Sequence, residues 1–283
     1  MQPPHPPRRR SVAGMEIAFG ATLGAYALLI AGILVADLLL VAGTPLGRVR
    51  FWESICDKDV LHAIWLSVWT SSLAAIIALA IAVPSGYVLS RYRFRGRPLL
   101  DAIVDVPIVL PPILFGISLL VLFQRTSVGP ALRAVGLKFV HEPAGIVLVQ
   151  VLIATAYGTR MLKGAFDGLD PRLSAVAQTL GCTRARAFFT VMLPTVRNSI
   201  VAALVMMWAY ALALYGPVIA FVGSTSGYTE VMPTRIYLEM SVGRLEAALA
   251  VSLMMIAMAA VVLLIVKLAG GTGRDEMARM TRM

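Results

Sequence analysis

The stretch SAVAQTLGCTRARAFFTVMLP, residues 174–194, stands out because it is polar and arginine-bearing in an otherwise apolar chain. Just before it, Asp170 and Pro171 predict a helix start, since a carboxylate caps free backbone N–H groups and proline tolerates the first helical position. Gly181 suits the left-handed residue that ends a helix, and Thr183 is a good cap for a second one. The stretch therefore predicts a helical hairpin.

Each predicted helix carries one apolar stripe at helical spacing. The stripes consist of Leu173, Val176, Ala177 and Leu180 in the first helix, and of Ala185, Phe188, Phe189 and Met192 in the second. Pro194 is expected to stop the second helix. Two interpretations are open: the stripes pack on the inner ends of the chain's own membrane helices, or they form a docking element for another protein.

The rest of the chain has the composition of a membrane protein. Of its 283 residues, 59% are hydrophobic and 14% are charged, and the mean hydropathy is +0.82. A bilayer core needs about 20 consecutive apolar residues per helix. Six stretches qualify, near residues 15–42, 61–90, 99–124, 142–163, 198–223 and 246–269. The sequence therefore predicts an all-α, polytopic membrane protein with six transmembrane helices.

Most of the Lys and Arg residues fall on the side of the predicted membrane helices that carries the N-terminus, and the positive-inside rule then places both termini in the cytoplasm. The net charge of +10 records this topology, so no nucleic-acid partner is expected. Residues 1–14 are Pro-rich and then basic, which predicts a disordered cytoplasmic N-terminus. Residues 15–42 are expected to form the first transmembrane helix. Residues 270–283 are expected to form a cytoplasmic tail.

The hairpin resembles the signature of permease subunits of ATP-binding-cassette importers of type I. That signature has a Glu-Ala-Ala triplet, a glycine after three intervening residues and, after a fixed interval, an aliphatic residue, a spacer, Leu and Pro. The matching positions here are Ala175, Val176, Ala177, Gly181, Val191, Leu193 and Pro194. One departure is that Ala175 stands where the family has Glu, so an ion pair made by that Glu has no counterpart.

The resemblance extends over about residues 60–268, the expected transport domain. DVPIVLPPILFGISLLVLF (105–123), GLDPRL (168–173) and TEVMPTRIYLEMSVGRLEAALAVSL (229–253) look like the branch that carries molybdate, tungstate and sulfate. That branch often has a Glu-Phe pair before the pore-side glycine, whereas Leu214 and Tyr215 precede Gly216 here. The cargo implied is a small oxyanion, tungstate or molybdate first and sulfate next.

The resemblance implies a role for the hairpin, residues 170–194, in coupling to a cytoplasmic ATPase. The expected coupling residues are Ala175, Val176, Ala177, Leu180, Gly181, Thr183, Phe188, Leu193 and Pro194. The implied partners are the membrane, cytoplasmic ATPase subunits, a second permease copy that makes a homodimer, and an extracytoplasmic binding protein that docks on residues 43–60 and 224–245. The expected location is a prokaryotic plasma membrane.

Prolines and tyrosines mark a candidate pathway inside the membrane. Pro107, Pro111 and Pro112 predict a kinked or broken third helix with freed carbonyls, because proline lacks a backbone donor and clashes one turn back. Tyr210, Tyr215 and Gly216 offer hydroxyls and freed backbone groups for a gate. The alternatives are a packing kink and tyrosines that anchor the helix at the interface.

No enzymatic centre can be proposed. Asp101 and Asp105 lie one helical turn apart and are expected to pair with Arg91–Arg97 rather than bind a metal. GSTSG (223–227) lacks the lysine of a phosphate-binding loop. We therefore expect no catalytic residue and no bound cofactor, with ATP and magnesium used by the ATPase subunit. Alternatives are the same importer class with another small solute, a secondary transporter without an ATPase, and a membrane enzyme.

Overall fold

The computed structural model describes residues 10–270, with side chains from Ile17 to Leu264, and this part of the chain holds helices and no strands. Four helices are long and apolar enough to cross a membrane: α1 (Arg10–Gly43), α3 (Lys58–Arg91), α7 (Pro143–Asp167) and α14 (Leu245–Gly270). Two bent helix pairs raise the number to six if each pair is one span. The all-α, multi-span class predicted from the sequence is confirmed.

The predicted third span, residues 99–124, is a bent pair. The chain bends by 112° between helix α4 (Arg97–Val109) and helix α5 (Pro112–Arg125). Leu110 and Pro111 lie between them in extended conformations, because Pro112 cannot continue the ladder of α4. The break predicted from the prolines is confirmed.

The predicted fifth span, residues 198–223, is also interrupted. Helix α11 (Arg197–Ala213) ends before Leu214, and the short helix α12 (Gly216–Phe221) starts after Tyr215. At the N-terminal end of the chain, α1 begins at Arg10, before the predicted start of the first span at residue 15. A long apolar helix extends readily through good helix formers such as Ala13. Residues 1–9 and most of the predicted tail lie outside the described residues.

The core of the molecule is the contact between α3 and α7. Ala74, Ala78, Ala82 and Gly86 recur every fourth residue on α3, and all four are buried. A Cβ on Gly86 would lie 2.9 Å from the backbone nitrogen of Lys163, and one on Gly158 would lie 3.1 Å from the Ala82 Cβ. Small residues at this spacing let two membrane helices approach closely.

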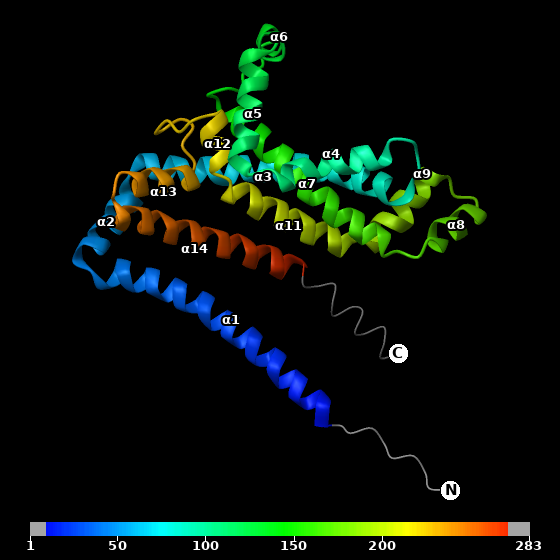
Figure 1. Ribbon diagram of the computed structural model, residues 1–283, viewed down its shortest axis with the longest axis horizontal. Coiled ribbons are helices and arrows are strands. Elements are labelled where there is room, and N and C mark those ends of the chain that lie inside the picture. Colours follow the sequence, from blue (N-terminus) through cyan, green and yellow to red (C-terminus); the bar gives the residue numbers. More distant parts are fainter. Residues whose placement is uncertain (1–9, 271–283) are drawn as a thin grey trace.

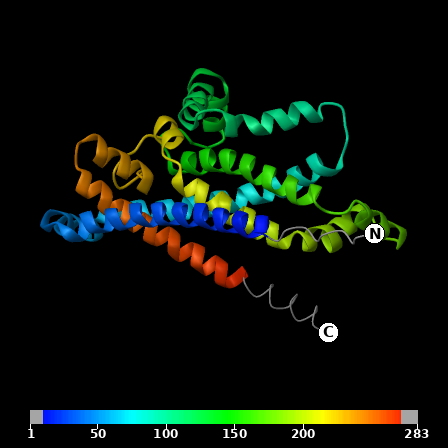
Figure 2. The ribbon, with the colours of Figure 1, turned by 60° about the horizontal axis from the view of Figure 1, so that its bottom comes forward.

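Three helices form a central layer, with α11 packed on both α3 and α7. Figure 1 shows the layer with α8 (Arg172–Thr179) and α9 (Arg184–Ala187) at one end, and α2 (Pro45–Cys56) and α13 (Met232–Ser241) at the other. α5 and α6 (Val128–Ala134) project from it. Figure 2 shows α4 and α14 on opposite faces of this layer. The two ends of the layer thus carry different structures.

We expect Gly86→Val to destabilise the fold by roughly 1–3 kcal/mol, because the added methyl groups would force α3 away from the α7 backbone. The matched control is Gly164→Val on α7, where a Cβ meets nothing within 4 Å. Thermal unfolding of both variants in the same detergent measures the difference. Equal midpoints for the two variants would show that the close approach at Gly86 is not a constraint.

Candidate functional site

The first helix of the hairpin begins and ends as its sequence predicts. The Arg172 N–H donates to Asp170 Oδ1 over 2.9 Å. At the other end Gly181 has φ +86°. The N–H groups of Gly181 and Cys182 donate to the carbonyls of Gln178 and Ala177, both at 3.0 Å. These bonds form a Schellman closure, which satisfies the last carbonyls of α8.

The second helix begins at Thr183, whose Oγ1 accepts from the Arg186 N–H at 3.2 Å. Pro194 does not stop this helix, so that prediction is wrong. A π-helical turn, η1 (Phe188–Met192), is followed by α10 (Leu193–Thr195), which includes Pro194. The Leu193 N–H donates five residues back to Phe188, and this wider turn accommodates the proline ring. The chain then bends by 73° into α11.

The two apolar stripes of the hairpin have different surroundings. On α8, Val176 is 56% exposed and Leu180 is 80% exposed. Ala175 and Leu173 are exposed as well, and Ala177 is the buried residue of α8. Apart from Ala177, the first stripe therefore does not pack within the chain, and it presents an apolar surface.

The second helix anchors the hairpin to the membrane helices. The ring centroid of Phe188 lies 4.5 Å from the ring centroid of Tyr87 and 6.2 Å from that of Phe166. Ala187 and Met192 are fully buried, Leu193 is half-buried and Pro194 is exposed. Ala185 and Phe189 of the predicted stripe are exposed, so only part of this stripe packs on the chain's own helices, and the π turn shifts the buried register within this helix.

The residues predicted for the pathway fall into two places. The N-terminal ends of α5 and α12 meet: a Cβ on Gly116 would lie 2.5 Å from the Pro217 carbonyl oxygen, and one on Gly216 would lie 3.4 Å from Ile113. Pro111 and Pro112 directly precede Ile113 at this contact. Pro107 lies earlier, inside α4, where the helix continues through it. The structure thus brings the α4–α5 break next to the α11–α12 break.

The two tyrosines of the predicted gate have aromatic partners. The Tyr157 hydroxyl donates to the Tyr210 hydroxyl at 2.9 Å, and Tyr215 stacks on Tyr237 with 5.5 Å between ring centroids. Sequence reasoning missed Gln150, a buried residue whose amide donates to the Ala211 carbonyl over 3.0 Å. That carbonyl lies in the last turn of α11, where its own chain supplies a long bond of 3.4 Å from the Leu214 N–H.

An inner charge cluster, Asp101, Asp105, Arg160 and Lys163, joins α4 to α7. Arg160 pairs with Asp101 at 3.0 Å and makes a two-pronged contact with Asp105. Lys163 pairs with Asp101 at 3.3 Å. The predicted pairing with Arg91–Arg97 is wrong, because α7 packs on α4 and brings its own cations there. Within residues 10–270, no three His, Cys, Asp or Glu side chains are placed to hold a metal.

An outer charge cluster lies at the opposite end of the molecule. Arg235 on α13 pairs with Glu230 at 3.0 Å, Glu239 at 3.1 Å and Asp57 at 3.4 Å. Burial by itself would lower the pKa of the Arg235 guanidinium, but its hydrogen bond to Glu230 and the surrounding carboxylate charges raise that pKa above its ordinary value. Arg235 therefore stays charged and holds α13 to the α2–α3 junction. Asp57 lies 178 residues from Arg235 in the sequence, so this connection was missed.

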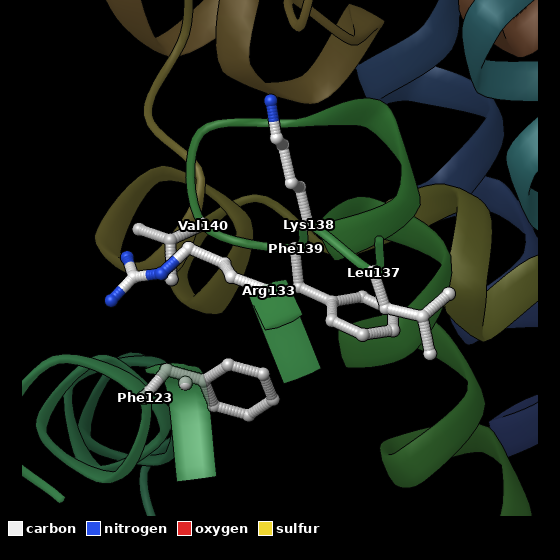
Figure 3. A pocket seen from close by; sticks show the side chains of 7 residues that line it. Phe123, Arg133, Leu137, Lys138, Phe139 and Val140 are labelled. Carbon is white, nitrogen blue, oxygen red and sulfur yellow. The ribbon is translucent and has the colours of Figure 1, made fainter. Parts of the chain in front are cut away.

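A small cavity between α5, α6 and the following loop encloses about 80 Å³. Figure 3 shows the rings of Phe123 and Phe139 at this cavity, while the charged ends of Arg133 and Lys138 extend away from the rings. The two rings meet edge to face at 5.7 Å. The cavity is smaller than the roughly 300–1,000 Å³ of ligand sites, and it is best explained as packing around the α5–α6 turn.

This helical bundle, with its capped hairpin at one end, defines the membrane component of an ATP-binding-cassette importer. Residues 78–270 match the family described as "binding-protein-dependent transport system inner membrane component", and the chain belongs to that family. It is 33% identical to the molybdenum transport system permease protein ModB of Mycobacterium tuberculosis, over 83% of this chain and 89% of that protein.

Further relatives agree with this assignment. A probable molybdenum permease of Haloferax volcanii is 31% identical over 93% of this chain and 96% of its own length. In fold, the chain is similar to a component of a bacterial transporter that imports alginate, with a TM-score of 0.73 over 93% of this chain and 98% of that one. The identity of 17% means that this likeness concerns the fold alone.

We expect Asp105→Asn to weaken the attachment of α4 to α7 by roughly 1–3 kcal/mol, between the values of exposed and buried ion pairs, because Arg160 would lose its two-pronged partner. The control is Glu53→Gln, which breaks the well-exposed pair with Arg50 and should change stability by less than about 0.5 kcal/mol. Thermal unfolding compares the two variants. No difference between them would mean that the inner charge cluster does not hold α4.

Proposed function

We propose that this chain is the permease subunit of an ATP-driven importer and forms the translocation path for a small oxyanion, in a prokaryotic plasma membrane. The names of relatives support this cargo. WtpB of Thermococcus kodakarensis, named a molybdate/tungstate permease, is 35% identical over 59% of this chain. CysT of Escherichia coli, named a sulfate permease, is 27% identical over 88%. Tungstate or molybdate is the first choice, sulfate the second and another small solute the third.

The observation that carries the coupling role is the exposed apolar face of α8. Leu180 and Val176 are large, apolar and exposed at the end of the molecule where the positive-inside rule places the cytoplasm. Such a surface marks an interaction site. Ala175, in the position of the family's Glu, is exposed too, so the ATPase groove is met by apolar contact at this point. ATP and magnesium belong to that separate subunit.

The second permease copy is supported by the surface of α1. Only 6% of the apolar window of this helix is buried within the chain, whereas 67% of that of α7 is buried. α1 contacts α2 and α14, and Figure 1 shows it separating from the bundle toward its N-terminal end. We propose that two copies enclose the path, lined near Pro107, Pro111, Pro112, Tyr210, Tyr215 and Gly216. A binding protein would deliver the anion to residues 43–60 and 224–245.

Val176→Asp and Leu180→Asp should each weaken ATPase binding by tenfold or more, because burying an unpaired carboxylate in an apolar contact costs more than the roughly 1.4 kcal/mol that corresponds to a tenfold change. Since both side chains are exposed, the permease should fold normally. Val135→Asp, at an exposed valine outside the hairpin, is the matched control. Co-purification with the ATPase and ATP-dependent uptake are measured. Unchanged binding in both hairpin variants would exclude the coupling role.

The cargo is tested by uptake into vesicles that hold the chain, its ATPase and its binding protein. Labelled tungstate, molybdate and sulfate are offered in competition, and ATP-dependent accumulation of tungstate or molybdate is expected. Stimulated ATP hydrolysis without uptake of any of these anions would be consistent with the importer assignment but would contradict the oxyanion cargo. Uptake by the chain without any ATPase would replace the proposal with secondary transport.

A further inference from the structure

The corner between α3 and α4 concentrates positive charge at the inner side of the membrane. Arg91 ends α3, Arg97 begins α4, and Arg93 and Arg95 lie in the short loop between them. Gly96 has φ +90°, which lets the chain reverse tightly into α4. Four arginines therefore occupy a turn of only seven residues, 91–97.

Only one of these arginines has a structural role. Arg91 donates to the carbonyls of Phe166 and Leu169 at 2.7 and 2.8 Å, which ties α3 to the end of α7. Among the described residues, the ion pairs involve none of Arg93, Arg95 and Arg97. Arg93 and Arg95 are exposed. These three side chains are thus free to bind an anion.

Beside this turn an apolar cavity of about 330 Å³ lies between α3 and α4. Its lining consists of Pro84, Ser85, Val88, Leu89, Phe94, Leu100 and Val104. Pro84 lies on α3 and Val104 lies on α4, on the two walls of the cavity. At a rise of 1.5 Å per residue, each of them lies roughly 10 Å along its helix from the arginine turn. The cavity therefore extends from the basic turn into the apolar part of the membrane.

We propose that this corner is a binding site for an anionic phospholipid. Its phosphate is held by Arg93, Arg95 and Arg97, and the start of an acyl chain fills the cavity between α3 and α4. Basic clusters on the cytoplasmic side of membrane helices recognise anionic headgroups in this way. The positive-inside rule alone accounts for the arginines, but not for an apolar cavity directly beside them.

Charge complementarity favours a lipid over a second copy of this chain. Among the described residues, the inner carboxylates already have partners within the chain: Asp101 and Asp105 pair with Arg160 and Lys163, Asp167 accepts from the Ser90 hydroxyl, and Asp170 accepts from the Arg172 backbone N–H. A free oxyanion does not suit the apolar lining. An amphiphile with one negative head and an apolar tail matches both parts of the site.

The test uses the full chain, purified in detergent and titrated with phosphatidylglycerol or phosphatidylcholine, with bound lipid counted by native mass spectrometry. We expect the wild type to retain phosphatidylglycerol preferentially. The triple variant Arg93→Gln, Arg95→Gln, Arg97→Gln should lose affinity on the order of 100-fold, since each arginine near an anionic lipid contributes roughly a fivefold gain. Val104→Trp, which fills the cavity, should reduce retention while all the arginines are present.

The matched control removes three cations from the opposite side of the membrane, by Arg125→Gln, Arg133→Gln and Lys138→Gln, and should keep the preference. Equal binding of both lipids by the wild type, or equal losses in the two triple variants, would overturn the proposal. So would unchanged retention in Val104→Trp. A Leu100→Cys variant that forms a disulfide between two copies would instead assign the cavity to the permease interface. All these readouts are independent of transport.

Discussion

The close approach of α3 and α7 is the constraint on which the rest of the molecule depends. Lipid tails are as apolar as leucine, so membrane helices associate through close packing and hydrogen bonds rather than by leaving water. Gly86 and Gly158 remove the side chains that would separate the two backbones. Because α7 is fixed in this way, Arg160 and Lys163 face α4, and Asp167 ends α7 where the hairpin begins. One contact thus positions both the inner charge cluster and the hairpin.

The irregular segments of the chain follow from the same packing. A broken helix leaves backbone groups unsatisfied, and at membrane depth this is tolerated only where protein or water surrounds them. At the break at Leu214 and Tyr215, Gln150 of α7 supplies a short bond to the Ala211 carbonyl, which receives only a long bond of 3.4 Å from the Leu214 N–H. The break before Pro112 lies against α12, where Gly116 allows contact with the Pro217 backbone. The two breaks therefore occur together, beside a helix that is held rigidly.

Local signals were enough to predict the hairpin but not its continuation. Asp170, Gly181 and Thr183 act within a few residues of their own position, so their caps could be inferred. The π turn before Pro194 could not, because it forms where Phe188 packs on Tyr87 and Phe166. The partners of Asp105 were missed for the same reason, since Arg160 lies 55 residues away. The four-residue spacing of Ala74, Ala78, Ala82 and Gly86 was a readable signal for close packing.

The strength of each connection suggests which part of the permease moves. The hairpin is joined to α3 and α7 by buried aromatic contacts at Phe188 and by the hydrogen bonds of Arg91 to the end of α7. A force on the exposed face of α8 would therefore displace these helices with the hairpin. α4 has no buried residue and is held to α7 chiefly by the inner charge cluster. Ion pairs of this kind rearrange more readily than a packed core, because each charged group can replace its partner by another charged group or by water. With a break at Leu110 and Pro111 on its far side, α4 is the segment that can shift relative to α7 without disturbing the close contact of α3 and α7.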